Sequence, residues 1–141
     1  MTGETRLLLD THFWIWGREY DNRRISRHLA ERLDAAAVEG RLLLHPISAW
    51  EVGLLVKKRR LTLDRPVRQW LDEALHLPGI RVVEFTPEIA MESALLEAPA
   101  LTDPVDRILV ATAQVLGATL LTSDRKILDW AAGGGVRVME G

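Results

Sequence analysis

Four acidic residues are the strongest candidates for chemistry in this sequence: Asp10, Glu51, Asp106 and Asp124. They are far apart in the chain, but each lies at or soon after a point where an apolar segment gives way to a predicted helix. Carboxylate oxygens are the ligands that Mg²⁺ and Mn²⁺ prefer. Ions held in this way activate water and neutralise phosphate charge, so the four acids indicate phosphodiester hydrolysis if the fold brings them together.

Each acid also has a structural explanation at the start of a helix. Asp10 and Asp124 lie between a predicted strand and a predicted helix, where Asp often caps the helix. Residues 48–51, Ser-Ala-Trp-Glu, match the capping-box pattern. Residues 103–106, Asp-Pro-Val-Asp, are typical of a cap, a first-turn proline and an acid that the helix dipole favours. For each acid taken singly, the sequence does not decide between helix capping and a chemical role.

Hydrophobic periodicity predicts alternating strands and helices along the whole chain. The expected strands are 6–9, 41–44, 80–85, 118–122 and 136–139. The expected helices are 11–16, 26–38, 47–60, 66–77, 87–96, 104–116 and 124–131. This alternation implies right-handed crossovers and a mostly parallel sheet that is covered on both faces. The expected fold class is therefore α/β, a single-domain three-layer α/β/α sandwich over residues 1–141.

The expected positions of the acids argue for one shared site. Ligands of a parallel α/β sheet bind at the carboxyl ends of its strands, and Asp10 and Asp124 follow two such ends. Glu51 falls inside the apolar stripe of its helix, and Asp106 falls at the margin of its own stripe. No Lys or Arg shares these stripes nearby, and buried carboxylates are costly unless they are paired or bound to metal. A bound cation is the simplest compensation.

Composition narrows the functional classes. The chain has 141 residues, 48% of them hydrophobic, which suits one domain with a sizeable core. It has no cysteine, which removes disulfides, thiolate zinc sites and cysteine nucleophiles. It has no signal-peptide core at its start and no apolar run of about 18 residues, so we expect a cytoplasmic protein with no membrane contact.

The charge distribution bears on nucleic-acid binding. The net charge is −2, so an interface with nucleic acid would have to be a local patch. The one dense basic run is residues 57–60, Lys-Lys-Arg-Arg. It favours either a charged helix end or contact with RNA phosphates, and the sequence leaves both open.

Four segments of the chain carry a family resemblance: 8–12 (Leu-Leu-Asp-Thr-His), 47–52, 103–113 and 121–124 (Leu-Thr-Ser-Asp). Together they resemble the PIN-domain nucleases, and within them the VapC-type toxins of toxin–antitoxin pairs. The resemblance implies a PIN-like fold and a metal site for Mg²⁺ or Mn²⁺ made by the four acids. It also implies an RNA substrate, a homodimer and a cognate antitoxin that occludes the active site.

Residues beside the four acids are candidates for supporting roles. Thr11 and Ser123 are expected to hydrogen-bond a ligating carboxylate or a water. Asp103 belongs to the Asp-Pro-x-Asp-Arg form of the family motif, and we interpret it as a helix cap. Arg107 directly follows an acid and is expected either to meet substrate phosphate or to balance the acidic cluster. His12 follows Asp10 and is a candidate for substrate contact, with a purely structural histidine as the alternative.

The chain also contains five tryptophans. We expect Trp50 in the core. For the other four the sequence leaves two roles open, core packing or an apolar groove for a partner: Trp14, Trp16, Trp70 and Trp130.

The leading hypothesis is a Mg²⁺- or Mn²⁺-dependent endoribonuclease, the toxin of a type II toxin–antitoxin system. A catalytically inactive module that binds RNA or protein is the alternative. A third class, phosphatases of the haloacid-dehalogenase type or receiver domains, fits less well, because such a phosphatase needs an Asp two residues after the first and position 12 is His. The number of ions and the RNA that is cleaved are not indicated by the sequence.

Overall fold

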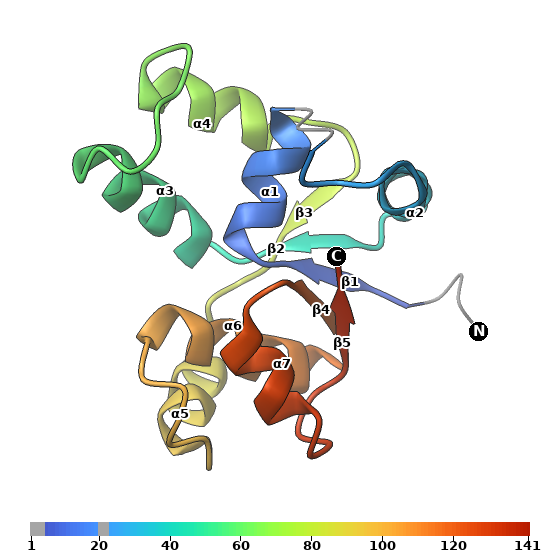
Figure 1. Cartoon of the computed structure of the whole chain (residues 1–141), viewed down its shortest axis with the longest axis vertical. Helices are drawn as coiled ribbons and strands as arrows, with labels where there is room; N and C mark the ends of the chain where they lie inside the picture. Colours follow the sequence, from blue (N-terminus) through green and yellow to red (C-terminus); the bar gives the residue numbers. More distant parts are fainter. Residues whose placement is uncertain (1–4, 20–22) are drawn as a thin grey trace.

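Five short strands form one sheet in the computed structural model, which describes residues 5–19 and 23–141 (Figure 1). The strands are β1 (Leu7–Leu9), β2 (Leu42–Leu44), β3 (Ile80–Val82), β4 (Thr119–Thr122) and β5 (Val138–Glu140). Their order is β3-β2-β1-β4-β5, and every neighbouring pair is parallel. Residues 1–4, which include most of the segment used to judge a signal peptide, lie outside the described residues.

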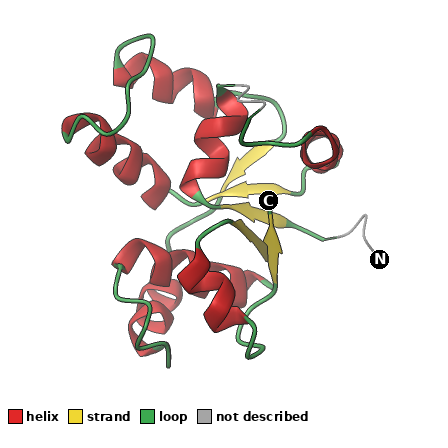
Figure 2. Cartoon of the chain, viewed as in Figure 1, coloured by secondary structure: helices red, strands yellow, loops and turns green. Residues whose placement is uncertain are grey.

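The helices cover both faces of this sheet. They are α1 (Thr11–Arg18), α2 (Arg27–Val38), α3 (Ile47–Lys57), α4 (Val67–Leu75), α5 (Pro87–Leu95), α6 (Pro104–Leu116) and α7 (Arg125–Ala131). Figure 2 shows α1 to α4 on one side of the strands and α5 to α7 on the other. The three-layer α/β/α sandwich predicted from the alternating pattern is confirmed. Within the described ranges, no helix combines the length and apolar character needed to cross a bilayer.

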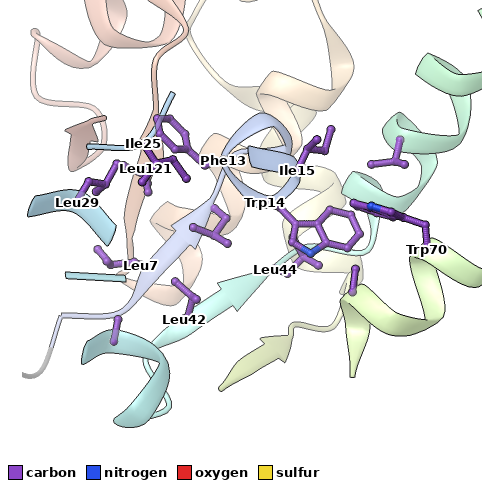
Figure 3. Close-up of a cluster of buried hydrophobic side chains, with 14 residues drawn as sticks. Leu7, Phe13, Trp14, Ile15, Ile25, Leu29, Leu42, Leu44, Trp70 and Leu121 are labelled. Atoms are coloured by element: carbon purple, nitrogen blue, oxygen red, sulfur yellow. The ribbon is translucent and has the colours of Figure 1, made fainter. Parts of the chain in front are cut away.

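The leucine runs of the central strands build two separate cores, because successive side chains of a strand point to opposite faces. Leu7 and Leu9 pack toward α1, α2 and α4, in the core drawn in Figure 3. Leu8 packs on the other face, in the cluster made with α6 and α7. In the first core the rings of Trp14 and Trp70 meet edge to face, 5.1 Å apart, and both are fully buried. Strands buried on both faces explain why the sequence shows continuous apolar runs there.

Trp50 is the main correction to the predicted core, because its side chain is 57% exposed. The residues of α3 that are buried are Ser48 and Val52, which lie four positions apart and share one face of the helix. Position 50 lies halfway between them and therefore points away from the core.

Several predicted elements have other bounds than expected, among them one helix and two strands. The helix expected over 47–60 ends at Lys57, and Arg59 then takes a left-handed backbone conformation with φ 58°. The strand expected over 80–85 ends at Val82, and the strand expected over 136–139 runs from Val138 to Glu140. None of these differences moves the acids.

The strand order creates a crevice at the carboxyl edge of the sheet. β1 lies at the centre, between β2 and β4. The chain passes from β1 into α1 on one face and from β4 into α7 on the other face (Figure 2). Adjacent strands whose connections diverge in this way leave an open crevice between them, where α/β folds place their ligands. Asp10 directly follows β1, and Asp124 follows β4 after one residue, Ser123.

Candidate active site

A pocket of about 380 Å³ lies at this crevice, and acidic side chains dominate its lining. The acids are Asp10, Glu51, Asp103, Asp106 and Asp124. The other lining residues are His12, Phe13, Trp16 and Ser123. The structure thus brings together all four acids that the sequence singled out and adds Asp103, although these residues come from four separate segments of the chain.

Asp10 occupies the N-cap position of α1, but its side chain does not cap the helix. Its Oδ2 instead accepts a hydrogen bond of 2.7 Å from the Thr122 hydroxyl at the end of β4. The same hydroxyl accepts a 3.0 Å bond from the backbone N–H of Asp124. Thr122 therefore couples two of the acids. Sequence reasoning missed it, although a hydroxyl residue at the end of a leucine-rich strand, next to Ser123 and Asp124, was an available signal.

Two of the acids do cap helices and line the pocket as well. Asp124 accepts bonds from the N–H groups of Lys126 and Ile127, at 2.9 and 3.4 Å, and both reach the same oxygen, Oδ1. Asp103 accepts a 2.9 Å bond from the N–H of Val105, which confirms its predicted role as a cap of α6. Capping and chemistry are therefore not alternatives at these positions, because a carboxylate has a second oxygen to offer.

Glu51 does not belong to a capping box, so that explanation is wrong. Pro46 occupies the N-cap position of α3, which places Ser48 inside the helix. The Ser48 hydroxyl accepts a buried hydrogen bond of 2.9 Å from Thr11, which ties the starts of α1 and α3 together. The His45 ring supplies the missing cap, since its Nδ1 accepts from the N–H of Ile47 at 2.8 Å. Thr11 thus supports the site by joining two helices.

Negative charge predominates in the pocket, where the charge of His12 lowers the pKa of Asp10 and Glu51 only against larger effects that raise it. Burial raises the pKa of Asp106 to about 7, and the charges of Asp124 and Asp103 add to this effect. Burial also raises the pKa of Asp10, against the hydrogen bond from Thr122. Among the described residues, the lining contains no Lys or Arg. Carboxyl groups that resist ionisation in a shared pocket are a common feature of functional sites.

The pKa of Glu51 is raised in the same way. Burial is the largest cause, and the charge of Asp10 reinforces it, while the Thr11 hydroxyl acts in the opposite direction. A half-buried acid on the inner part of α3 matches the position that the sequence predicted for this residue.

The donor set fits a hard divalent cation, because every candidate ligand is a carboxylate oxygen. The side chains share the pocket without being gathered around one point. Among the described His, Asp and Glu residues, no group of three is arranged to hold an ion as it stands. A cation bound among the acids would offset their mutual repulsion.

Arg107 is turned away from the acids, which corrects the expectation that it meets substrate or balances their charge. Its guanidinium donates hydrogen bonds of 2.8 to 3.3 Å to five backbone carbonyls, those of Ser93, Ala94, Leu96, Ala98 and Leu101. These carbonyls belong to the end of α5 and the segment that leads to α6. Arg107 therefore holds the backbone that precedes the acidic start of α6.

The remaining candidates lie at the rim of the pocket or outside it. His12 and Ser123 are exposed and contribute to the lining. The basic run 57–60 is exposed at the far end of α3 and does not line the pocket.

Comparison with known proteins agrees with this architecture. A model of the PIN-domain family matches residues 7–132. Ribonuclease VapC22 of Mycobacterium tuberculosis is 32% identical over 123 residues, which cover 87% of this chain and 90% of that protein.

Two solved structures of toxin–antitoxin complexes share the fold. DNA-bound VapBC from Salmonella typhimurium matches with a TM-score of 0.69 at 17% identity, over 96% of this chain and 98% of that chain. VapBC2 from Rickettsia felis, bound to a DNA fragment from its promoter, matches with a TM-score of 0.63 at 12% identity, over the same shares of the two chains. With the fold, the match over residues 7–132 and the identity to VapC22 in agreement, this chain belongs to the PIN-domain family.

Proposed function

We propose that this chain is a Mg²⁺- or Mn²⁺-dependent endoribonuclease and the toxin of a type II toxin–antitoxin system. The observation that carries the proposal is the acidic pocket, where carboxylates from four segments meet and three of them have raised pKa values. The identity to a ribonuclease over most of the chain supports RNA as the substrate. Such an enzyme would act in the cytoplasm.

Asp10, Glu51, Asp106 and Asp124 would hold the cation. When bound, a divalent ion supplies positive charge against the phosphate and increases the acidity of an attacking water. Thr122 orients Asp10 for this role, because its hydroxyl occupies Oδ2 and fixes the carboxylate plane. Asp124 keeps one oxygen outside the cap of α7. The acids therefore enter the site already oriented by neighbouring elements.

The test of the proposed activity is Asp10→Asn. Replacing one charged oxygen by an amide keeps the size of the side chain and removes a ligand, so kcat/KM for RNA cleavage in Mn²⁺ should fall by roughly 100-fold or more. Asp72→Asn is the matched control, because Asp72 has a side chain that is 76% exposed and does not line the pocket. If Asp10→Asn and wild type cleave RNA at the same rate, the proposed mechanism is wrong.

A cognate antitoxin is the proposed protein partner. The VapBC structures that share the fold support a partner of this kind. We propose that it occludes the acidic pocket. The product of a short reading frame next to this gene should co-purify with the chain and suppress RNA cleavage, and cleavage that continues unchanged in such a complex would contradict occlusion.

A second copy of the chain is the other proposed partner. Met91 and Leu95 lie four residues apart on α5, so they share one face, and they are 53% and 63% exposed. An apolar helix face that the protein itself leaves uncovered supports burial against another molecule. In the homodimer, this face of α5 in one copy would pack against the same face of α5 in the other copy.

A further inference from the structure

One wall of the acidic pocket is aromatic, and the metal site does not account for it. Its residues, His12, Phe13 and Trp16, all come from α1. His12 and Trp16 lie four positions apart on one face of the helix, with ring centroids 5.7 Å apart and planes tilted by 46°. Phe13 is buried behind them and meets Trp16 edge to face at 5.0 Å.

The two outer rings of this wall, those of His12 and Trp16, are not buried in the core as Phe13 is. Phe13 is 1% exposed and anchors α1 to the sheet together with Trp14 and Ile15. His12 is exposed, and Trp16 packs against this core but is only partly buried. His12 and Trp16 therefore leave apolar, flat surface at the edge of a pocket whose other walls are carboxylates. Such a surface suits a planar group brought in by a ligand.

A cation accompanies the wall. The guanidinium carbon of Arg24 lies 5.5 Å from the centre of the Trp16 ring, and Arg24 is exposed. A guanidinium placed over an indole is a favourable contact, and the same two groups stack on nucleobases. Proteins commonly bind single-stranded nucleic acid with aromatic rings that stack on bases and nearby positive charges that contact phosphates.

The size of the pocket leaves room for such a group. Six water-sized ligands around an ion, at about 30 Å³ each, occupy roughly 180 Å³. The pocket has a volume of about 380 Å³. The pocket, which His12, Phe13 and Trp16 line on one side, is therefore larger than a hydrated ion needs.

We propose that His12 and Trp16, together with Arg24, bind a nucleobase of single-stranded RNA next to the phosphate that is cleaved. The proposal rests on the ribonuclease function proposed above and adds the surface that positions its substrate. Stacking on the wall would hold the neighbouring phosphate at the carboxylates. The enzyme would then require a base, as well as a phosphodiester, beside the cleaved bond.

The experiment compares an RNA that the wild type cleaves with the same RNA carrying an abasic nucleotide on either side of the cleaved bond. We expect the wild type to cleave the intact RNA about tenfold faster in kcat/KM than at least one abasic RNA, since one stacked base contributes on this order. Trp16→Leu and His12→Ala should each cleave the intact RNA and that abasic RNA at similar rates. Trp16→Phe, which keeps a ring, should retain most of the preference.

Trp50→Leu is the matched control, because Trp50 is an exposed tryptophan that does not line the pocket, so this variant should keep the full preference. Circular dichroism of each variant establishes that it is folded, and His12→Ala removes a side chain that is already exposed.

Equal cleavage of intact and abasic RNA by the wild type, or a full preference in both Trp16→Leu and His12→Ala, would overturn the base site and leave the nuclease proposal standing. If the wild type cleaves no RNA at all in Mn²⁺, so that no starting RNA exists, both proposals are overturned. Loss of antitoxin binding in Trp16→Leu with its RNA preference intact would assign the wall to the protein partner instead.

Discussion

At the scale of single residues, Asp106 shows how the acidic pocket lowers the stability of the metal-free fold. It lies in the first turn of α6, among the carboxylates of Asp10, Glu51, Asp103 and Asp124. Burial and these charges raise its pKa to about 7, so its ionised form is unfavourable when no cation is present. If Asp106 serves metal binding and not stability, replacing it should stabilise the metal-free fold, so its effect on stability is a direct test.

Asp106→Asn should therefore stabilise the metal-free protein at pH 8. Folding raises the pKa of Asp106 from the ordinary value of 3.8 to about 7. The stabilisation from its protonation is therefore fully present below about 3.8 and is lost as pH rises through about 7. Asn mimics the neutral form at every pH. In EDTA, the unfolding free energy from urea titration should exceed that of wild type by about 1 to 2 kcal/mol at pH 8, after allowing for solvent screening, and by less at pH 5.

Two comparisons make this result specific. Asp72→Asn, at an exposed site outside the pocket, should show no such pH-dependent gain. Added Mn²⁺ should stabilise wild type more than Asp106→Asn, because the variant has lost a ligand. A variant that is less stable than wild type at pH 8 in EDTA would mean that the carboxylate is satisfied without a cation.

At the scale of elements, the site depends on how the segment between α5 and α6 is held. The last carbonyls of a helix have no partner within it, and those of Ser93 and Ala94 near the end of α5 are bonded by Arg107 instead. The same guanidinium reaches the carbonyl of Leu101, two residues before the cap of α6. One side chain of α6 therefore positions the backbone that carries Asp103 into the pocket.

Arg107→Lys should lower stability and leave chemistry largely intact. A lysine has one nitrogen and cannot reach five carbonyls arranged around a planar guanidinium, so we expect a loss of about 2 to 3 kcal/mol in urea titrations. Arg125→Lys is the control, since Arg125 makes solvent-exposed ion pairs with Asp129 and Glu140, and it should change stability by about 0.5 kcal/mol or less.

The same pair of variants decides whether Arg107 acts on substrate. Under conditions where Arg107→Lys is folded, its kcat/KM per folded molecule should stay within about threefold of wild type, because its hydrogen bonds are to the backbone. A variant of wild-type stability that has lost cleavage would restore the role in substrate binding that the sequence suggested.

At the scale of the whole molecule, the exposed apolar residues lie mostly away from the acidic pocket. The large ones are Val38, Trp50, Val82, Phe85, Met91 and Leu95. Two of them, Met91 and Leu95, form the face of α5 that we propose for the homodimer. Val38, at the end of α2, lies in the opposite helical layer (Figure 2).

Leu95→Glu should convert a dimer into a monomer in sedimentation velocity at micromolar protein. A charge placed at the centre of an apolar contact must be buried without a partner, which costs more than such an interface can supply. Val38→Glu, an equally polar change at a more exposed position on the other layer, should leave the dimer intact. A wild type that sediments as a monomer at all concentrations would contradict the proposed homodimer.

The order of the elements, the parallel sheet and the meeting of the four acids at one edge could be predicted from the amino-acid sequence alone. These depend on local information: the leucine runs of β1 and β2 are continuous because both faces are buried, and the turns that end α6 and precede β4 are marked by Gly117. Asp10 and Asp124 could be assigned to one edge because the carboxyl ends of parallel strands always share an edge. Only the ends of several elements were misplaced.

The tertiary structure alone decided which groups meet across elements. Thr122 bonds Asp10 because β4 pairs with β1, a neighbour 112 residues away in the chain. The guanidinium of Arg107 bonds carbonyls at the end of α5, and Trp50 faces solvent. Neither could be predicted, because which face of a helix is buried depends on the elements that pack against it. The same packing of elements places the ring of Trp16 in the pocket that the acids line. Periodicity names residues that share a face of one element, whereas a site is made where the faces of different elements come together.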